Sequence, residues 1–279
     1  NIANRIKYLY VMGYLKNRAA VLQYQNISED KTNFLDTWIH YECFEEQLDY
    51  FTKNNIPIIP LCDVDAYIRG NLHVEKQSFS LTFDTGYIEL YTLCYPLLKK
   101  YGYSAAFFIR PDTVGKIEDV HGRRVQYMDW DQIRKLESDG ITIGMYGCKG
   151  MIATKVPLGE IEKEIKDARL VFEKELGKKI VYYSVREGAP TKQMINLFES
   201  EGFEAVFCQA PTQKKTYPYA VGRIQIDDND LNILLIKTKR PYIFFKDSKY
   251  WTLGRKCKLD KVIHFVSDTI NRLNGKKIN

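Results

Sequence analysis

Short apolar runs alternate along this chain with longer segments in which apolar residues recur every three or four positions. The short runs predict β-strands, and the longer segments predict amphipathic helices. Such an alternation is typical of an α/β fold built on a parallel sheet. We predict strands at residues 19–24, 79–83, 104–109, 141–146, 180–184, 204–208 and 222–226, and helices at 41–53, 64–69, 87–101, 129–139, 158–176, 192–201 and 259–273.

Polar residues and glycines mark the ends of several predicted helices. Asp129 stands where it can cap a helix N-terminus, and Gly140 follows the end of the same helix. No linker, repeat or low-complexity segment interrupts the alternation, so residues 19–279 are expected to form one domain. The two long predicted loops, 111–125 and 209–218, are the segments of such a fold that tend to carry function.

Residues 1–18 precede this domain as an amphipathic segment. The segment contains Arg5, Lys7 and Lys16 among its apolar residues, and it is too short and too charged to span a bilayer. Three interpretations are open: a helix that packs on the domain, the remainder of a removed signal or anchor, or a segment that contacts a membrane surface from one side.

Composition narrows the class of protein without choosing a function. A chain of 279 residues that is 45% hydrophobic can bury the core of one large α/β domain. The net charge of +6 is spread along the chain, so nucleic-acid binding is not indicated. The 20 tyrosines, 14 phenylalanines and 3 tryptophans suit either a surface that stacks on sugar rings or, as is commoner, a packed core.

The six cysteines lie far apart and form no CxxC pair, so zinc-ribbon spacing is absent. Three disulfides are arithmetically available. Apolar neighbours favour buried free thiols instead, and the redox compartment stays open. The cysteines with such neighbours are Cys43, Cys62, Cys94 and Cys208.

Candidate chemistry lies where the apolar strand 79–83 meets the next helix. Asp84 stands at this junction and is followed by Thr85 and Gly86. In α/β enzymes a carboxylate at the C-terminal end of a strand is a common position for chemistry. Asp84 therefore has two interpretations. It is either an acid or base, or a carboxylate that accepts backbone N–H bonds at the start of the following helix. The 4 histidines are too scattered to form a compact site.

Several segments, in order and at matching spacing, resemble one known family. Together they resemble the polysaccharide deacetylases of the NodB homology family, also called carbohydrate esterase family four, and especially the branch that acts on poly-N-acetylglucosamine. The resemblance implies a distorted (β/α)7 barrel of parallel strands surrounded by helices. The segments are 21–27 (VLQYQNI), 44–50 (FEEQLDY), 80–84 (SLTFD), 105–109 (AAFFI), 128–134 (MDWDQIR) and 202–207 (GFEAVF).

Family members hydrolyse an N-acetyl amide with a divalent metal such as zinc, which the motifs T-F-D-D-G and H-[ST]-x-x-H hold. By this resemblance Asp84 occupies the position of the general base, and Thr85 occupies that of the metal-binding acid. Tyr146 and Gly150 occupy the two histidine positions. A hydroxyl, a phenol and a residue without a side chain are poor ligands for such a metal. No metal or other cofactor is therefore expected.

The resemblance also defines the remaining candidate residues. Ser184 stands where the family has an arginine, and Gln25 stands where it has a histidine in the opening strand. Two groups of candidates follow from these positions. The catalytic candidates are Asp84, Glu187 and Arg186, and the substrate-binding candidates are Tyr146, Cys148, Tyr183 and Trp130.

Three hypotheses for the function remain open. The first is a catalytically impaired homologue, a pseudoenzyme, that binds or helps to process an N-acetylglucosamine-containing glycan, alone or with a protein partner. The second is an active N-deacetylase with a rearranged site in which Glu187 or Cys148 assists Asp84. The third is a structural or assembly subunit with a vestigial groove. The resemblance favours a location outside the cytoplasm or at a membrane.

Overall fold

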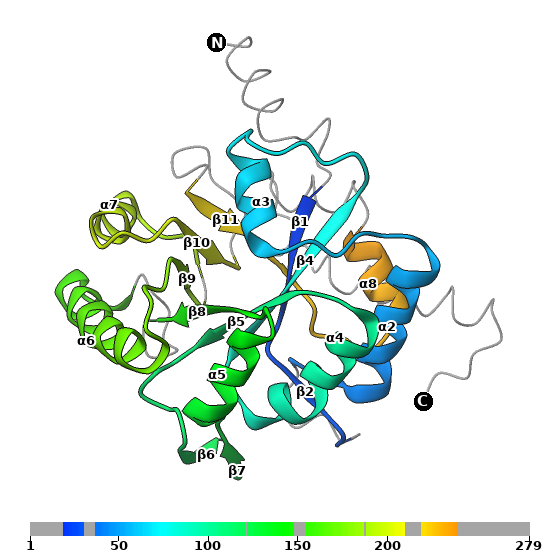
Figure 1. Ribbon diagram of the computed structural model, residues 1–279, viewed down its shortest axis with the longest axis horizontal. Coiled ribbons are helices and arrows are strands. Elements are labelled where there is room, and N and C mark those ends of the chain that lie inside the picture. Colours follow the sequence, from blue (N-terminus) through cyan, green and yellow to red (C-terminus); the bar gives the residue numbers. More distant parts are fainter. Residues whose placement is uncertain are drawn as a thin grey trace.

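A parallel sheet curled into a barrel forms the centre of the protein in the computed structural model (Figure 1). The structure describes residues 19–30, 37–120, 122–147, 155–186, 188–209 and 219–238. The strands follow one another in the order β11-β10-β9-β8-β5-β4-β1-β12. Their bounds are β1 (Ala19–Tyr24), β4 (Ser78–Thr85), β5 (Ala105–Ile109), β8 (Thr142–Tyr146), β9 (Tyr182–Ser184), β10 (Ala205–Cys208), β11 (Ala220–Gly222) and β12 (Ile224–Gln225).

A single segment closes the barrel. β11 pairs with β10, β12 pairs with β1, and only Arg223 separates β11 from β12. The two short strands are therefore halves of one extended segment that changes its partner at Arg223. Counted this way, the 8-stranded sheet has seven strand positions around the barrel. The predicted distorted (β/α)7 barrel is confirmed.

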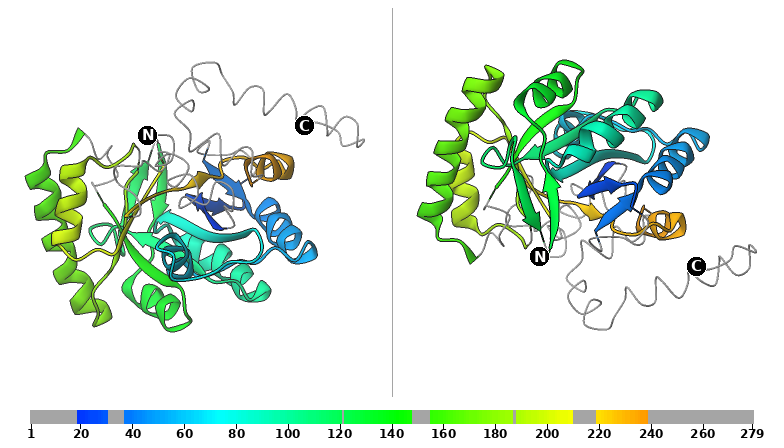
Figure 2. Two further views of the ribbon diagram at one scale, coloured as in Figure 1. Left: turned by 90° about the horizontal axis from the view of Figure 1, so that it is seen from above. Right: turned by 90° about the horizontal axis from the view of Figure 1, so that it is seen from below.

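Helices cover the outside of the barrel (Figure 2). α2, α5 and α6 lie where the apolar periodicity predicts them. Asp129 and Gln132 form a reciprocal capping box at the start of α5, and Gly177 ends α6 in the left-handed conformation. The helices are α2 (Tyr41–Lys53), α3 (Leu61–Ile68), α4 (Tyr95–Tyr101), α5 (Trp130–Ser138), α6 (Leu158–Leu176), α7 (Lys192–Ser200) and α8 (Leu231–Thr238).

Strand alternation divides the core into an inner and an outer layer. Val21, Phe108 and Phe207 point into the barrel, where residues of α3 pack against them. The neighbouring residues on the same strands point outward and pack under the helices, as Leu22 and Phe107 do. Burial of each such large side chain stabilises the fold by about 1.5–3 kcal/mol. The inner layer is apolar toward the N-terminal ends of the strands and polar near their C-terminal ends, where the candidate site lies.

Four segments differ from the expectation, and one of them is the unpredicted helix α8 (Leu231–Thr238). The loop predicted at 111–125 contains an antiparallel hairpin of β6 (Ile117–Val120) and β7 (Arg123–Gln126). The helix predicted at 87–101 is divided into a π-helical segment, η1 (Leu90–Cys94), and α4. A small parallel pair, β2 (Asn26–Ser28) and β3 (Trp38–His40), was not predicted.

The predictions for residues 1–18 and for a helix at 259–273 lie outside the described residues, so the single-domain assignment stays a prediction. None of the helices that the structure describes is long and apolar enough to cross a membrane.

The described cysteines are free thiols, as predicted, but they are not all buried. Cys94 and Cys208 are buried, whereas Cys43 is partly exposed and Cys62 is exposed. The prediction of burial was therefore wrong for Cys62, which lies in the first turn of α3, on the side of that helix away from the barrel. Burial raises the pKa of the Cys94 thiol well above its usual range.

Candidate functional site

The end of β4 carries the residue around which the candidate site is built. Thr82 and Asp84 alternate with Phe79, Leu81 and Phe83, so the two polar side chains point into the barrel. Asp84 lies near the C-terminal end of the barrel and is only 1% exposed. A carboxylate buried to this extent requires partners, because an isolated charge is strongly disfavoured away from water.

A buried arginine from the closing segment supplies the principal partner. Arg223 is fully buried and donates two parallel hydrogen bonds of 2.8 Å, from Nη1 to Oδ1 and from Nη2 to Oδ2 of Asp84. Its guanidinium also donates to the hydroxyls of Ser184 (2.7 Å) and Thr82 (3.2 Å). It lies 5.4 Å from the ring centre of Phe108. The bidentate geometry is the strongest form of such a pair.

Two further side chains complete the surroundings of the carboxylate. Gln23 of β1 donates to Oδ2 at 2.6 Å, and Ser184 of β9 donates to Oδ1 at 3.2 Å. Each oxygen of Asp84 therefore accepts two hydrogen bonds, which is the full capacity of a carboxylate. An additional donor, such as a reacting water, would have to displace one of these groups. Asp84 thus joins four strand positions of the barrel wall: β1, β4, β9 and the closing segment.

The residue after Asp84 has an unusual backbone. Thr85 has a φ of 82°, in the left-handed region that a β-branched residue rarely adopts. Its Oγ1 is buried and has no hydrogen-bond partner within the described residues. Gly86 follows with a φ of 89°, and a Cβ there would lie 3.0 Å from Cδ1 of Ile109. The turn from strand to helix is therefore tight, and threonine fits it at a cost in strain.

Tyr146 lies close to this network at the end of β8. The side chain is 3% exposed, and burial followed by the negative charge of Asp84 raises the pKa of its phenol far above the ordinary value. The positive charges of Arg186 and Arg223 oppose this shift in the pKa. The candidates Asp84, Tyr146 and Arg186 are therefore brought together at the C-terminal end of the barrel, and the phenol stays protonated near neutral pH.

An aromatic group continues from this end of the barrel. Tyr87 stacks on Tyr127 with ring centres 4.9 Å apart, and it contacts Trp38 at 5.4 Å. The hydroxyl of Tyr127 donates to Glu118 of the β6–β7 hairpin at 3.1 Å. The hairpin and β3 thus pack around Tyr87, which directly follows the Asp84–Gly86 turn.

Comparison with known proteins now identifies the family. The family model described as polysaccharide deacetylase matches residues 71–227, more than half of the 279-residue chain. The chain belongs to the polysaccharide deacetylase family. The family resemblance seen in the sequence motifs is thereby confirmed.

Individual relatives of this polysaccharide deacetylase family member are distant in sequence. YxkH of Bacillus subtilis (strain 168) is 18% identical over 185 residues, which are 66% of this chain and 63% of YxkH. The chain thus spans less than two thirds of that curated relative.

Solved structures with the same fold cover the chain more fully. IcaB from Ammonifex degensii matches with a TM-score of 0.67 and 19% identity, over 83% of this chain and 98% of IcaB. A de-N-acetylase from Aggregatibacter actinomycetemcomitans matches with a TM-score of 0.64 and 19% identity, over 78% and 98%. The deacetylase PplD of Streptococcus pyogenes matches with a TM-score of 0.64 and 16% identity, over 82% and 98%.

The metal that the family implies does not fit the residues of this deacetylase homologue. At the positions that the resemblance assigns to metal ligands, Thr85 offers a neutral hydroxyl on a strained turn, and Tyr146 offers a buried, protonated phenol. Gly150 has no side chain and lies outside the described residues. Within the part of the chain that the structure describes, no group of three or more His, Cys, Asp or Glu residues could hold a metal ion.

Two substrate-binding candidates of the deacetylase homologue lie in the outer core layer. Tyr183 points away from Ser184 and packs on Phe198, with ring centres 4.5 Å apart. Trp130 contacts Phe172 of α6 edge to face at 5.8 Å. Neither contact is with Asp84 or its partners. The structure therefore gives both residues packing roles, while Glu187 and Cys148 lie outside the described residues.

Sequence reasoning missed Gln23 and Arg223, although both leave a signal. Gln23 is a polar residue at an inward position of an otherwise apolar strand, and Arg223 interrupts the apolar run at 220–226. Charged residues are almost never fully buried without a partner. Arg223, which was not among the candidates, is a cation that contacts Asp84 directly.

Proposed function

We propose that this chain is a catalytically impaired member of the polysaccharide deacetylase family that binds an N-acetylglucosamine-containing glycan. The observation that supports the impairment most is the closed set of partners around Asp84. In the family this position provides the general base, which must exchange a proton with a reacting water. Here both carboxylate oxygens are fully engaged within the barrel wall.

The replaced ligand positions support the same proposal. A divalent metal lowers the pKa of its bound water toward neutrality, and this effect drives hydrolysis in metal-dependent deacetylation. Thr85 and Tyr146 supply neither a carboxylate nor an imidazole for such a metal. Without the metal, the water would have to be activated by Asp84, which is occupied.

A glycan ligand is supported by the family and by the groups near the end of the barrel. Arg186 is exposed near the buried Tyr146, and its guanidinium can donate hydrogen bonds to sugar hydroxyls. Binding of a sugar without hydrolysis requires none of the missing ligands.

The test combines an activity assay with a binding assay. The purified chain should release no acetate from N-acetylglucosamine oligomers when zinc, cobalt or nickel is added, yet it should bind these oligomers saturably in calorimetry. A triple variant, Thr85→Asp with Tyr146→His and Gly150→His, restores the three family ligands and should gain metal binding. Metal-dependent acetate release by the unmodified chain would contradict the proposal.

A structural or assembly subunit is the second candidate. Its support is that Asp84 contributes to the barrel wall, which explains why the carboxylate is kept without catalysis. This candidate predicts no saturable glycan binding. The calorimetric titration therefore separates it from the glycan-binding proposal.

A further inference from the structure

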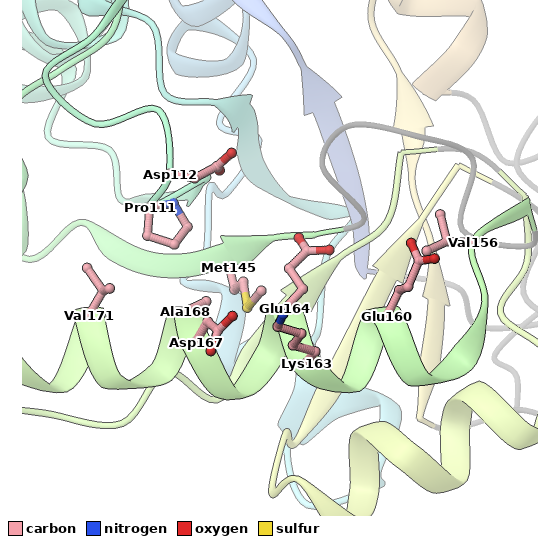
Figure 3. A pocket seen from close by; sticks show the side chains of 10 residues that line it. All are labelled: Pro111, Asp112, Met145, Val156, Glu160, Lys163, Glu164, Asp167, Ala168 and Val171. Atoms are coloured by element: carbon pink, nitrogen blue, oxygen red, sulfur yellow. The ribbon is translucent and has the colours of Figure 1, made fainter.

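A groove of about 480 Å³ lies between α6 and the segment that follows β5 (Figure 3). Pro111 and Asp112 form one side, and a face of α6 forms the other, with the side chain of Met145 between them. β5 and β8 both end at the C-terminal side of the barrel, where Asp84 lies, so the groove runs along the outer wall next to the candidate site.

The floor of the groove is mainly apolar, whereas its rim is acidic. Pro111, Val156 and Val171 contribute apolar surface, and the buried Met145 and Ala168 lie beneath it. Glu160, Glu164 and Asp167 are spaced by four and three residues, so they follow one face of α6 over about 10 Å. Asp112 adds a fourth carboxylate, and among the described residues that line the groove Lys163 is the one basic residue.

The rim charges are only partly compensated. Asp112 is paired with Arg110 at 2.7 Å. Glu160 and Asp167 have no ion pair within the described part of the chain, and both are exposed. These uncompensated carboxylates therefore create a negative electrostatic potential that attracts a positively charged ligand to the groove.

We propose that this groove binds an amino-sugar chain whose amines are free and protonated, as in a glucosamine polymer that has lost its acetyl groups. This inference rests on the proposed glycan-binding function and specifies the ligand. The apolar floor matches the C–H faces of sugar rings, and the row of carboxylates matches the ammonium groups of the deacetylated sugar. An acetylated sugar carries no charge to meet these carboxylates. The chain would thus recognise the product of the reaction that its family catalyses.

The experiment is a calorimetric titration with glucosamine oligomers and, separately, with N-acetylglucosamine oligomers, at about pH 6, where free amines are protonated. Glu160→Gln and Asp167→Asn each remove one rim charge at an exposed position and preserve shape. Each substitution should weaken glucosamine binding about threefold, and the double variant about tenfold. Glu173→Gln on α6 makes the same charge change at an exposed position that does not line the groove, and it should leave binding unchanged.

The outcomes separate this inference from the proposed function. Undiminished glucosamine binding by the double variant would overturn the groove as the site. A lysine-rich peptide that binds as tightly as the oligomer, with the same losses in the variants, would overturn the sugar assignment. Binding of acetylated oligomers alone would overturn the inference and leave the proposed function intact. Failure of both oligomers to bind would overturn both.

Discussion

The ion pair between Asp84 and Arg223 should dominate the stability of the barrel near its closure. Arg223→Met removes the guanidinium and retains an unbranched side chain of similar reach. Asp84 would then keep two of its four hydrogen bonds, those from Gln23 and Ser184, and its charge would stay buried without a cation. Breaking a buried pair in this way typically costs about 3–5 kcal/mol. We expect a loss of that size in the free energy of unfolding.

Urea denaturation measures this loss, and a double-mutant cycle isolates the pair. The double variant Asp84→Leu with Arg223→Met removes both charges, so it should be more stable than the sum of the two single losses predicts, by about 2 kcal/mol or more. Ser184→Ala removes one neutral donor and should cost about 1 kcal/mol. The reasoning would be refuted if Arg223→Met lowered the free energy of unfolding by about 1 kcal/mol or less and the effects of the two single substitutions were additive. A loss of about 1 kcal/mol is what one ordinary hydrogen bond contributes.

A further control moves the arginine from position 223 to position 184 and measures whether stability is recovered. By the sequence resemblance Ser184 corresponds to the family's arginine, and it contacts both Asp84 and Arg223. Adding Ser184→Arg to an Arg223→Ser background returns a guanidinium to the carboxylate from β9. The pair of substitutions should recover part of the lost free energy of unfolding. Ser184→Arg alone should destabilise the fold, because it places two guanidinium groups in one buried space.

Three further predictions concern the turn, the packing and the titration of buried groups. Thr85→Asn should raise the free energy of unfolding by about 1 kcal/mol in urea denaturation, because asparagine tolerates a φ of 82° better than threonine. A lower free energy of unfolding in this variant would contradict the inference that Thr85 is strained. Gly147→Ala should lower the free energy of unfolding by about 1–3 kcal/mol or more, because its Cβ would lie 1.6 Å from the hydroxyl of Tyr183. Gly159→Ala on α6 is the control: its Cβ would have no atom within 4 Å, so this substitution should not destabilise the fold. Burial raises the pKa of Tyr24 above its ordinary value of 10.0, so the native state keeps a proton that the unfolded chain releases. Stability should be complete below about pH 10 and fall above it by about 1.4 kcal/mol per pH unit for each such tyrosine, and Tyr24→Phe should reduce this slope in denaturation curves.

Features that depend on local sequence were predictable. The helix at Tyr41–Lys53 follows from apolar spacing, and Asp129 marks the start of α5 through its capping box. The position of Asp84 at the end of a strand follows from the apolar run before it. The hairpin after β5 was missed because its strands are mostly exposed and polar, so they lack the apolar alternation by which a strand is recognised.

Features that depend on distant partners were not predictable from pattern. Nothing local in the sequence pairs Arg223 with Asp84, because only the closure of the barrel brings β12 beside β1. The packing contacts of the aromatic candidates depend on distant partners as well. Tyr183 and Trp130 are suitable for sugar contact by residue type, but the face of the strand or helix that carries them decides what they touch.

The closing segment also determines whether the sheet has free edges. β1 and β10 have unpaired backbone groups on one side until residues 220–225 lie between them. These residues come late in the chain, so during synthesis the rest of the sheet exists first as an open structure with two exposed edges, to which other strands can add. A variant truncated before Ala220 would keep both edges of the sheet exposed, and it should self-associate through β1 and β10. This short segment therefore closes the barrel and covers both edges of the sheet.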